Sequence, residues 1–234
     1  MTPLAARLAG TIRAPRATFA RFLTAPRPPW LDVLLVSTCV LFVVRGALLS
    51  TDVGRLALLD QWEWTYTAFG GRMDDTLYAR LQVLSSQTLA VSAAFAFLLG
   101  PASTLVMTVV VNAALRLFKT STVTFTQVLS IVAHAGLILA LREAVSVPVH
   151  YLNESLSSPT SLGLLMAGAN EGSALASFLG TIDVFIVWWL FVIAAGLATV
   201  SHRTIRRTVA AFAGAYALVA LAVALAMVAS GGTT

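Results

Sequence analysis

The amino-acid sequence predicts an all-α fold, a polytopic bundle of five transmembrane helices with short interfacial helices. Hydrophobic residues make up 58% of the chain, charged residues only 11%, and the mean hydropathy is +0.87. Soluble domains are about 45–50% apolar and about 25% charged. The charge is also confined to short stretches between long apolar runs, and those stretches alternate in sign. We therefore expect a bilayer to be the main solvent of this chain.

Five apolar stretches approach the roughly 20 residues that cross a hydrocarbon core about 30 Å thick. They cover residues 31–50, 83–118, 125–149, 174–200 and 208–230. The sequence accordingly divides into three parts: a cytoplasmic Arg-rich segment with an interfacial helix at 1–30, a five-helix transmembrane domain at 31–230, and a short tail at 231–234.

The second stretch is longer than one straight crossing needs. Gly100 and Pro101 lie near its middle, and no polar turn follows them. Proline removes one backbone hydrogen bond and kinks a helix, so we interpret the stretch as one long helix kinked at Gly100 and Pro101. The alternative is a re-entrant hairpin, which requires its broken backbone to be shielded by protein.

The N-terminal segment contains one amphipathic turn before the first span. Phe19, Phe22 and Leu23 recur at helical spacing, which predicts a short helix over residues 17–23 at the cytoplasmic interface. Trp30 then marks the headgroup level where the chain enters the membrane.

The orientation follows from the basic residues of the short loops, which concentrate on the cytoplasmic side of membrane proteins. Five spans place these on one side: Arg7, Arg13, Arg16, Arg21, Arg27, Arg116, Lys119, Arg203, Arg206 and Arg207. The other side holds Asp52, Asp60, Glu63, Asp74, Asp75, Glu154 and Glu171 against only Arg55, Arg72 and Arg80. The N-terminus is thus predicted in the cytoplasm and the C-terminus outside. The Arg- and Ala-rich composition favours a bacterial inner membrane.

The predicted outer segment between the first two spans covers residues 51–82. Gly70 and Gly71 are expected to separate two short helices, the second beginning near Asp74. Asp74 and Asp75 would then be acidic residues at a helix N-terminus, where the helix dipole favours them. The later segment 151–173 is rich in Ser, Gly and Asn, and we expect it to be mobile.

Ionisable side chains within the spans are expensive and each needs a partner or water. At 1.5 Å per residue, four of them fall in the outer half of the bilayer, and we predict an ion-paired cluster in which Arg45 or Arg142 pairs with Asp183 and Glu143 closes the network. The cluster has two open interpretations, helix registration by buried charge or a pathway for substrate or protons. The residues assigned to it are Arg45, His134, Arg142, Glu143 and Asp183.

Two other polar groups in the spans have open roles. Asp32 lies near the cytoplasmic end, where it either reaches the interface or pairs with Arg27. His134 is eight residues before Arg142, near the same helical face, and is either a packing histidine or a protonation switch.

Several functions are excluded or disfavoured by missing patterns. No P-loop, dinucleotide-binding glycine fingerprint, nucleophile elbow or zinc-protease helix is present, and no metal-ligand spacing occurs. We therefore expect no enzyme, cofactor or metal. The pair Ser146 and His150, four residues apart, is the one suggestion of a hydrolase.

The expected partners are lipids and other helices, with no nucleic acid. Small residues in the last two spans predict packing surfaces: Ala194, Ala195, Gly196 and Ala198, then Ala210, Ala211, Ala213, Gly214 and Ala215. The basic residues expected to meet anionic lipid headgroups are Arg16, Arg21, Arg27, Arg203, Arg206 and Arg207.

Three segments of this chain resemble the Yip1 domain family of five-span membrane proteins. They are residues 14–19 with the Pro-Pro-Trp at 28–30, residues 124–129 at the start of the third span, and residues 183–188 running to Gly196. The resemblance implies a helical bundle with a cytoplasmic N-terminus, which eukaryotes use in membrane trafficking together with small GTPases. About 30 residues precede the first span here, shorter than the eukaryotic N-terminal region, which argues against GTPase binding. The family implies no catalytic residue.

Two functions remain as hypotheses from the sequence. The first is a non-enzymatic membrane scaffold, a lipid-organising or trafficking-like factor that associates with itself or with other membrane proteins. The alternative is a small-solute or ion transporter or channel that uses the charged cluster.

Overall fold

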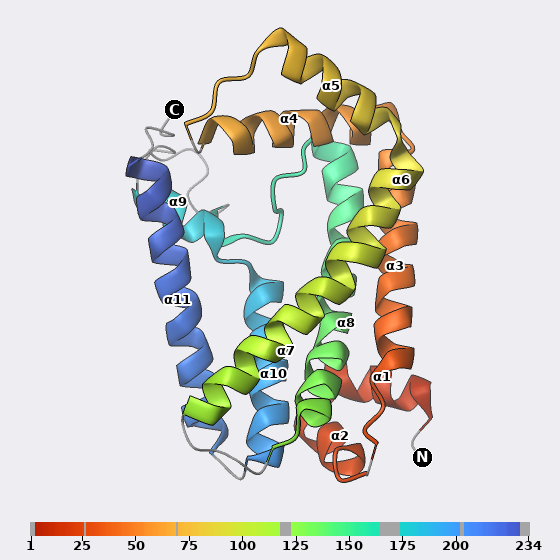
Figure 1. Cartoon of the computed structure of the whole chain (residues 1–234), viewed down its shortest axis with the longest axis vertical. Helices are drawn as coiled ribbons and strands as arrows, with labels where there is room; N and C mark the ends of the chain where they lie inside the picture. The colour runs from red at the N-terminus through yellow and green to blue at the C-terminus, as the bar shows by residue number, and fades with distance from the viewer. Residues whose placement is uncertain are drawn as a thin grey trace. The chain divides into compact units, whose positions relative to one another are not determined.

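The computed structural model describes residues 3–25, 27–68, 70–117, 123–163, 174–201 and 204–229, and these ranges are almost entirely helical (Figure 1). The helices are α1 (Leu4–Arg13), α2 (Pro15–Phe22), α3 (Leu31–Leu49), α4 (Asp52–Ala68), α5 (Asp75–Ser86), α6 (Thr88–Ala93), the π-helical η1 (Ala94–Leu99), α7 (Gly100–Leu117), α8 (Phe125–Asn153), α9 (Ala174–Thr181), α10 (Val184–Val200) and α11 (Ile205–Ala229). The predicted all-α class is confirmed.

Four of the described helical segments are long and apolar enough to cross a membrane. They are Leu31–Leu49, Thr88–Arg116, Phe125–Asn153 and Ile205–Ala226, and α10 is a shorter apolar helix of 17 residues. A rise of 1.5 Å per residue gives α10 a length of about 25 Å, slightly less than the hydrocarbon core.

The prediction of one continuous helix over residues 174–200 is wrong. The chain breaks between α9 and α10, and Asp183 forms an isolated antiparallel bridge with Ser161. The break at Ile182 and Asp183 adds only one polar side chain to the apolar pattern. The pattern alone therefore suggested a single span.

The second predicted span is helical from Thr88 through Arg116, as expected for a single crossing. The π-helical turns of η1 end directly before Gly100 and Pro101. Proline has no N–H for the carbonyl four residues earlier, and a π-helical segment is one way in which a helix accommodates such an interruption.

The described chain forms two compact units. The first comprises Met1–Leu41, Ala96–Leu141 and Phe185–Gly214, and the second Phe42–Phe95, Arg142–Val184 and Ala215–Thr234. Several long helices, including α3, α8 and α11, contribute residues to both.

The first unit has its core around the middle of α8. Ile131 and Ile138 of α8 and Ile193 of α10 are fully enclosed, and Phe19 and Phe22 of α2 belong to the same cluster. The helix predicted near residues 17–23 therefore exists, but its apolar face packs against protein instead of lying in a lipid interface. Helix α1, which precedes it, was not predicted.

Several large apolar side chains of α7 and α11 point outward, while some small or polar side chains of the same helices are buried. On α7, Thr104 and Thr108 are buried, and each hydroxyl donates to a carbonyl oxygen one turn earlier. On α11, Ala220 and Ala224 are buried. The exposed apolar side chains are Leu105, Val106, Val109 and Val110 of α7 and Leu218, Val219, Leu221 and Leu225 of α11. This inversion suits an apolar solvent, in which large side chains face lipid.

The second unit contains the two helices predicted on either side of Gly70, which adopts a left-handed φ of 81°. Asp74 caps α5 as expected, since its Oδ1 accepts the Leu77 amide hydrogen at 2.7 Å. Hydrogen bonds from that amide and from the Thr76 hydroxyl hold the pKa of the Asp74 carboxyl below its usual value. A small apolar cluster, formed by Leu49, Leu58 and Val91, packs in this unit.

Some predicted features fall outside the described residues. These are Lys119, Glu171, Arg203 and the tail 231–234.

The close packing of α10 generates a first prediction. A Cβ at Gly196 would lie 2.7 Å from the Ile131 Cγ2 and 3.1 Å from the Phe19 ring. We expect Gly196→Val to lower the free energy of unfolding by about 1–3 kcal/mol through overpacking, measured as thermal unfolding in detergent.

The matched control is Gly136→Val on α8, since a Cβ at Gly136 meets nothing within 4 Å. Equal loss of stability in both variants would contradict the packing role of Gly196.

Candidate functional site

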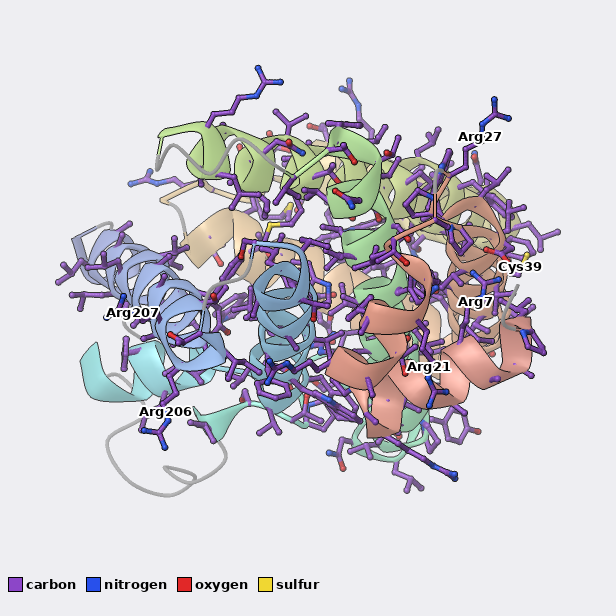
Figure 2. The ribbon with its side chains drawn as sticks, turned by 90° about the horizontal axis from the view of Figure 1, so that it is seen from below. Arg7, Arg21, Arg27, Cys39, Arg206 and Arg207 are labelled. Atoms are coloured by element: carbon purple, nitrogen blue, oxygen red, sulfur yellow. The ribbon has the colours of Figure 1, made fainter. Side chains whose placement is uncertain are left out.

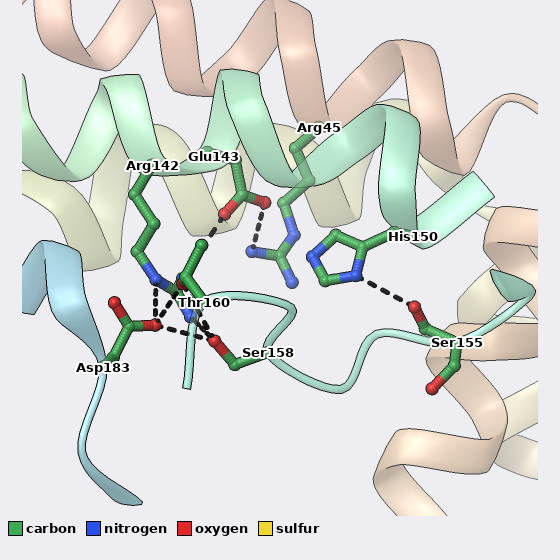
Figure 3. A network of polar contacts seen from close by, with 8 residues as sticks. All are labelled: Arg45, Arg142, Glu143, His150, Ser155, Ser158, Thr160 and Asp183. Carbon is green, nitrogen blue, oxygen red and sulfur yellow. Dashed lines mark hydrogen bonds and ion pairs between the residues drawn. The ribbon is translucent and has the colours of Figure 1, made fainter. Parts of the chain in front are cut away.

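Arg142 and Asp183 form the centre of a polar network in the second unit (Figure 3). The Arg142 Nε donates to the Asp183 Oδ2 over 2.8 Å, and the Ser158 and Thr160 hydroxyls donate to the same oxygen over 2.7 Å each. Arg142 also donates from Nη2 to the Ser158 Oγ over 3.0 Å. Asp183 is nearly inaccessible, so these donors replace its lost hydration.

Backbone contacts fix the position of Asp183. The Leu162 amide donates to the Ile182 carbonyl over 2.8 Å, and the Val184 amide donates to the Thr160 carbonyl over 3.1 Å. The Tyr216 hydroxyl of α11 donates to the Thr181 carbonyl over 2.7 Å and accepts the Asp183 amide hydrogen. The described part of the segment expected to be mobile is therefore tied to the network.

The same network continues along α8 to a second ion pair. The Arg45 Nη1 lies 3.3 Å from the Glu143 Oε1, and the Arg142 Nη1 lies 3.9 Å from the other Glu143 oxygen. The Arg45 guanidinium also stands 4.2 Å from the centre of the Phe95 ring, a cation–π arrangement.

His150 closes this end of the network. Its Nδ1 lies 2.9 Å from the Ser155 carbonyl oxygen. Because a carbonyl only accepts, Nδ1 carries the proton and Nε2 presents a lone pair. Figure 3 shows that Nε2 faces the side on which the Arg45 guanidinium lies.

The structure thus brings together four of the five residues assigned to the predicted cluster, namely Arg45, Arg142, Glu143 and Asp183, and their charges sum to zero. His134 makes its contacts elsewhere. The residues that sequence reasoning missed are Ser158, Thr160 and Tyr216, because hydroxyls in a Ser-rich segment or an apolar helix carry no distinguishing pattern.

A second charged cluster lies in the first unit. Arg7 of α1 is buried and pairs with Asp32 of α3 through two hydrogen bonds, one of them 3.4 Å long from Nη1 to Oδ1. The ion-pair partner of Asp32 is Arg7 instead of Arg27, and the Asp32 side chain is still 42% exposed, so its reach to the interface stays a prediction. Arg7 was counted among the cytoplasmic surface charges, and α1 brings it inside.

His134 is fully buried against this pair. Its Nδ1 lies 2.8 Å from the Ser130 carbonyl oxygen and its Nε2 lies 3.5 Å from the Arg7 Nη1. The first contact needs a protonated Nδ1 and the second an unprotonated Nε2, so the ring is neutral in this arrangement. The Phe22 ring stacks on it at 4.6 Å and the Phe19 ring meets it edge-on.

The arginines predicted to contact headgroups are exposed wherever they are described. They are Arg16, Arg21, Arg27, Arg206 and Arg207, of which all but Arg16 are labelled in Figure 2. Arg203 lies outside the described residues. Exposure is compatible with lipid contact but does not test it.

The described residues contain no group of three or more His, Cys, Asp or Glu side chains arranged to hold a metal ion. The Ser146 hydroxyl is buried and has no hydrogen-bond partner among the described residues, so it is not bonded to His150. The arrangement therefore lends no support to a serine nucleophile activated by that histidine.

Comparison with family models matched residues 9–228 to the Yip1 domain. This range covers essentially the whole chain. Searches of curated proteins and of solved structures found no match.

The Arg142–Asp183 pair generates a double-mutant prediction. Arg142→Met or Asp183→Leu alone leaves one buried charge without its partner, so each is expected to destabilise the protein more than the double variant does. The coupling energy, obtained from unfolding midpoints, is expected to be about 1–3 kcal/mol. Additive single effects would show that the pair contributes nothing as a pair.

The Arg7 cluster generates a second prediction in this site. Arg7→Met leaves Asp32 without its partner, and we expect faster amide hydrogen exchange throughout α1 and α2 because their anchor is lost. Arg13→Met, on the exposed side of the same helix, is the control. Unchanged exchange in both variants would mean that the aromatic contacts alone hold α1 and α2.

Proposed function

Because this chain belongs to the Yip1 domain family, we propose that it is a non-enzymatic protein that organises its membrane by binding lipids and a second copy of itself. The observation that carries the proposal is the uneven burial of its long apolar helices. Of the most apolar window of α8, 61% is buried, against 17% for Thr88–Arg116 and 11% for α11. These two segments, together with Leu31–Leu49 at 22%, offer apolar surface to molecules outside the chain.

The small residues of α11 favour a helix as one of those molecules. Ala211, Ala213, Gly214 and Ala215 are exposed, whereas the equivalent small residues of α10 are buried against α2 and α8. Small side chains allow two helices to approach closely in a bilayer. A homo-oligomer through α11 would use a surface that the single chain leaves uncovered.

The exposed arginines support lipid binding at the same membrane. Arg16, Arg21 and Arg27 surround α2, and Arg206 and Arg207 begin α11. Each juxtamembrane basic residue contributes on the order of 1 kcal/mol to binding of an anionic leaflet. With the positive-inside rule, this supports a cytoplasmic N-terminus and an external C-terminus, and the Arg- and Ala-rich composition is what favours a bacterial inner membrane.

Transport of a small solute or ion is a second candidate, favoured by one observation. The Arg45 Nε and the Ser146 hydroxyl are both buried without a hydrogen-bond partner among the described residues. Such unused donors beside ion pairs are typical of a site that holds something polar.

Self-association is tested by Gly214→Leu. In liposomes, a photoreactive residue at Leu218 is expected to cross-link two copies of the wild-type chain. The bulky side chain at position 214 keeps the helices apart, so the association constant should fall about tenfold or more, equivalent to about 1.4 kcal/mol.

The control is Val109→Leu, which enlarges an exposed apolar side chain of α7 and should leave the cross-linking unchanged. Cross-links to lipid alone in the wild type would overturn the proposed self-association.

A further inference from the structure

Two unused hydrogen-bond donors lie in one part of the Arg142 network. Five described buried side-chain atoms have no partner, and they are Arg7 Nε, Ser37 Oγ, Arg45 Nε, Ser146 Oγ and Trp189 Nε1. Two of them, on Arg45 and Ser146, share Glu143 as a neighbour. Arg45 binds Glu143 at 3.3 Å, and Ser146 lies one helical turn after Glu143. An unsatisfied buried donor is unfavourable because it has lost its hydrogen bonds to water.

The helical register places Ser146 in the middle of the polar face of α8. It follows Arg142 by four residues and Glu143 by three, and it precedes His150 by four. Residues at these spacings share a face. Elsewhere in the described helices, hydroxyls such as those of Thr108 and Thr199 bond to the carbonyl one turn earlier. The Ser146 hydroxyl does not, so it remains available to a ligand on that face.

The two halves of the network differ in how well their groups are satisfied. At Asp183, one carboxylate oxygen accepts from Arg142, Ser158 and Thr160. At the Arg45 end, the Arg45 Nε–H and the Ser146 hydroxyl are buried without a partner among the described residues, and the third group is the His150 Nε2, which faces the Arg45 side (Figure 3). Two of these three groups are donors, and a ligand between them must accept hydrogen bonds.

The charge balance decides what kind of acceptor fits. Arg45 and Arg142 are already compensated by Glu143 and Asp183. An anion alone would leave the buried cluster with a net negative charge, which is costly in an apolar environment. A proton on the His150 Nε2 restores neutrality and turns that nitrogen into a third donor.

We infer that one small monovalent anion, of the size of chloride, binds among Arg45, Ser146 and His150 together with one proton on His150. The Arg45 Nε–H, the Ser146 hydroxyl and the protonated His150 Nε2 donate to the anion. The charged groups that face His150 are Arg45 from α3 and Arg142 and Glu143 from α8, and the Ser155 carbonyl holds the other ring nitrogen. This inference stands whether or not the protein self-associates.

The test uses the full chain in nanodiscs, with chloride as the probe and gluconate at equal ionic strength as the reference. Thermal unfolding is followed against chloride concentration at pH 5.5 and at pH 8. Because one proton accompanies the anion, the half-saturating chloride concentration is expected to rise by up to about tenfold per pH unit once free His150 is neutral. Equal stabilisation by chloride and gluconate at both pH values would overturn the inference and leave water as the occupant.

Variants locate the site. Ser146→Ala removes one donor, and we expect at least a tenfold rise in half-saturating chloride at pH 5.5. His150→Gln should abolish the pH dependence. The matched control is Ser37→Ala, because the Ser37 hydroxyl is also buried and unpartnered but belongs to the first unit. Unchanged chloride binding in Ser146→Ala, or an equal loss in Ser37→Ala, would contradict the assignment. Removing an unsatisfied hydroxyl is not expected to impair folding, so Ser146→Ala remains informative.

Discussion

The cost of burying charge in an apolar environment is the constraint on which the second unit depends. Arg142 and Asp183 offset this cost together, because each provides an opposite charge in place of the water that burial removes from the other. The Ser158 and Thr160 hydroxyls complete the hydration shell of the carboxylate. As a result, residues 155–162 are held against α8 by polar contacts in a protein whose other contacts are mostly apolar.

The break between α9 and α10 follows from the same constraint. Non-helical backbone at membrane depth is tolerated only where protein or water satisfies its polar groups. Here the amide and carbonyl groups around Ile182 bond to Thr160, Leu162 and Tyr216. The carboxylate of Asp183 and its adjacent backbone are therefore satisfied by one set of neighbours, which explains why the helix ends at the charged residue.

The sequence predicted the features that depend on hydropathy and spacing. The all-α class, the two helices around Gly70 and the cap at Asp74 follow from local pattern and turn chemistry. Local pattern could not predict the interruption at Asp183 or the burial of Arg7, because both depend on partners distant in sequence. The partner is Ser161 in the first case and Asp32 in the second. Positive charge near an N-terminus usually indicates surface, and only the folding of α1 against α3 places Arg7 inside.

The two charged clusters are enclosed in different ways. Around Arg7 the neutral His134 ring and the aromatic rings of α2 close the cluster with apolar surface, which favours a fixed anchor for the N-terminal helices. Around Arg45 the guanidinium contacts Glu143 and the Phe95 ring, and the Arg45 Nε of α3 and the Ser146 hydroxyl of α8 have no partner among the described residues. A fully satisfied network is sufficient to register helices. Each cluster keeps one unpartnered arginine Nε, but only the Arg45 end adds a second unused donor, the Ser146 hydroxyl, and this surplus beside Glu143 favours an occupant over pure architecture at this end of the network.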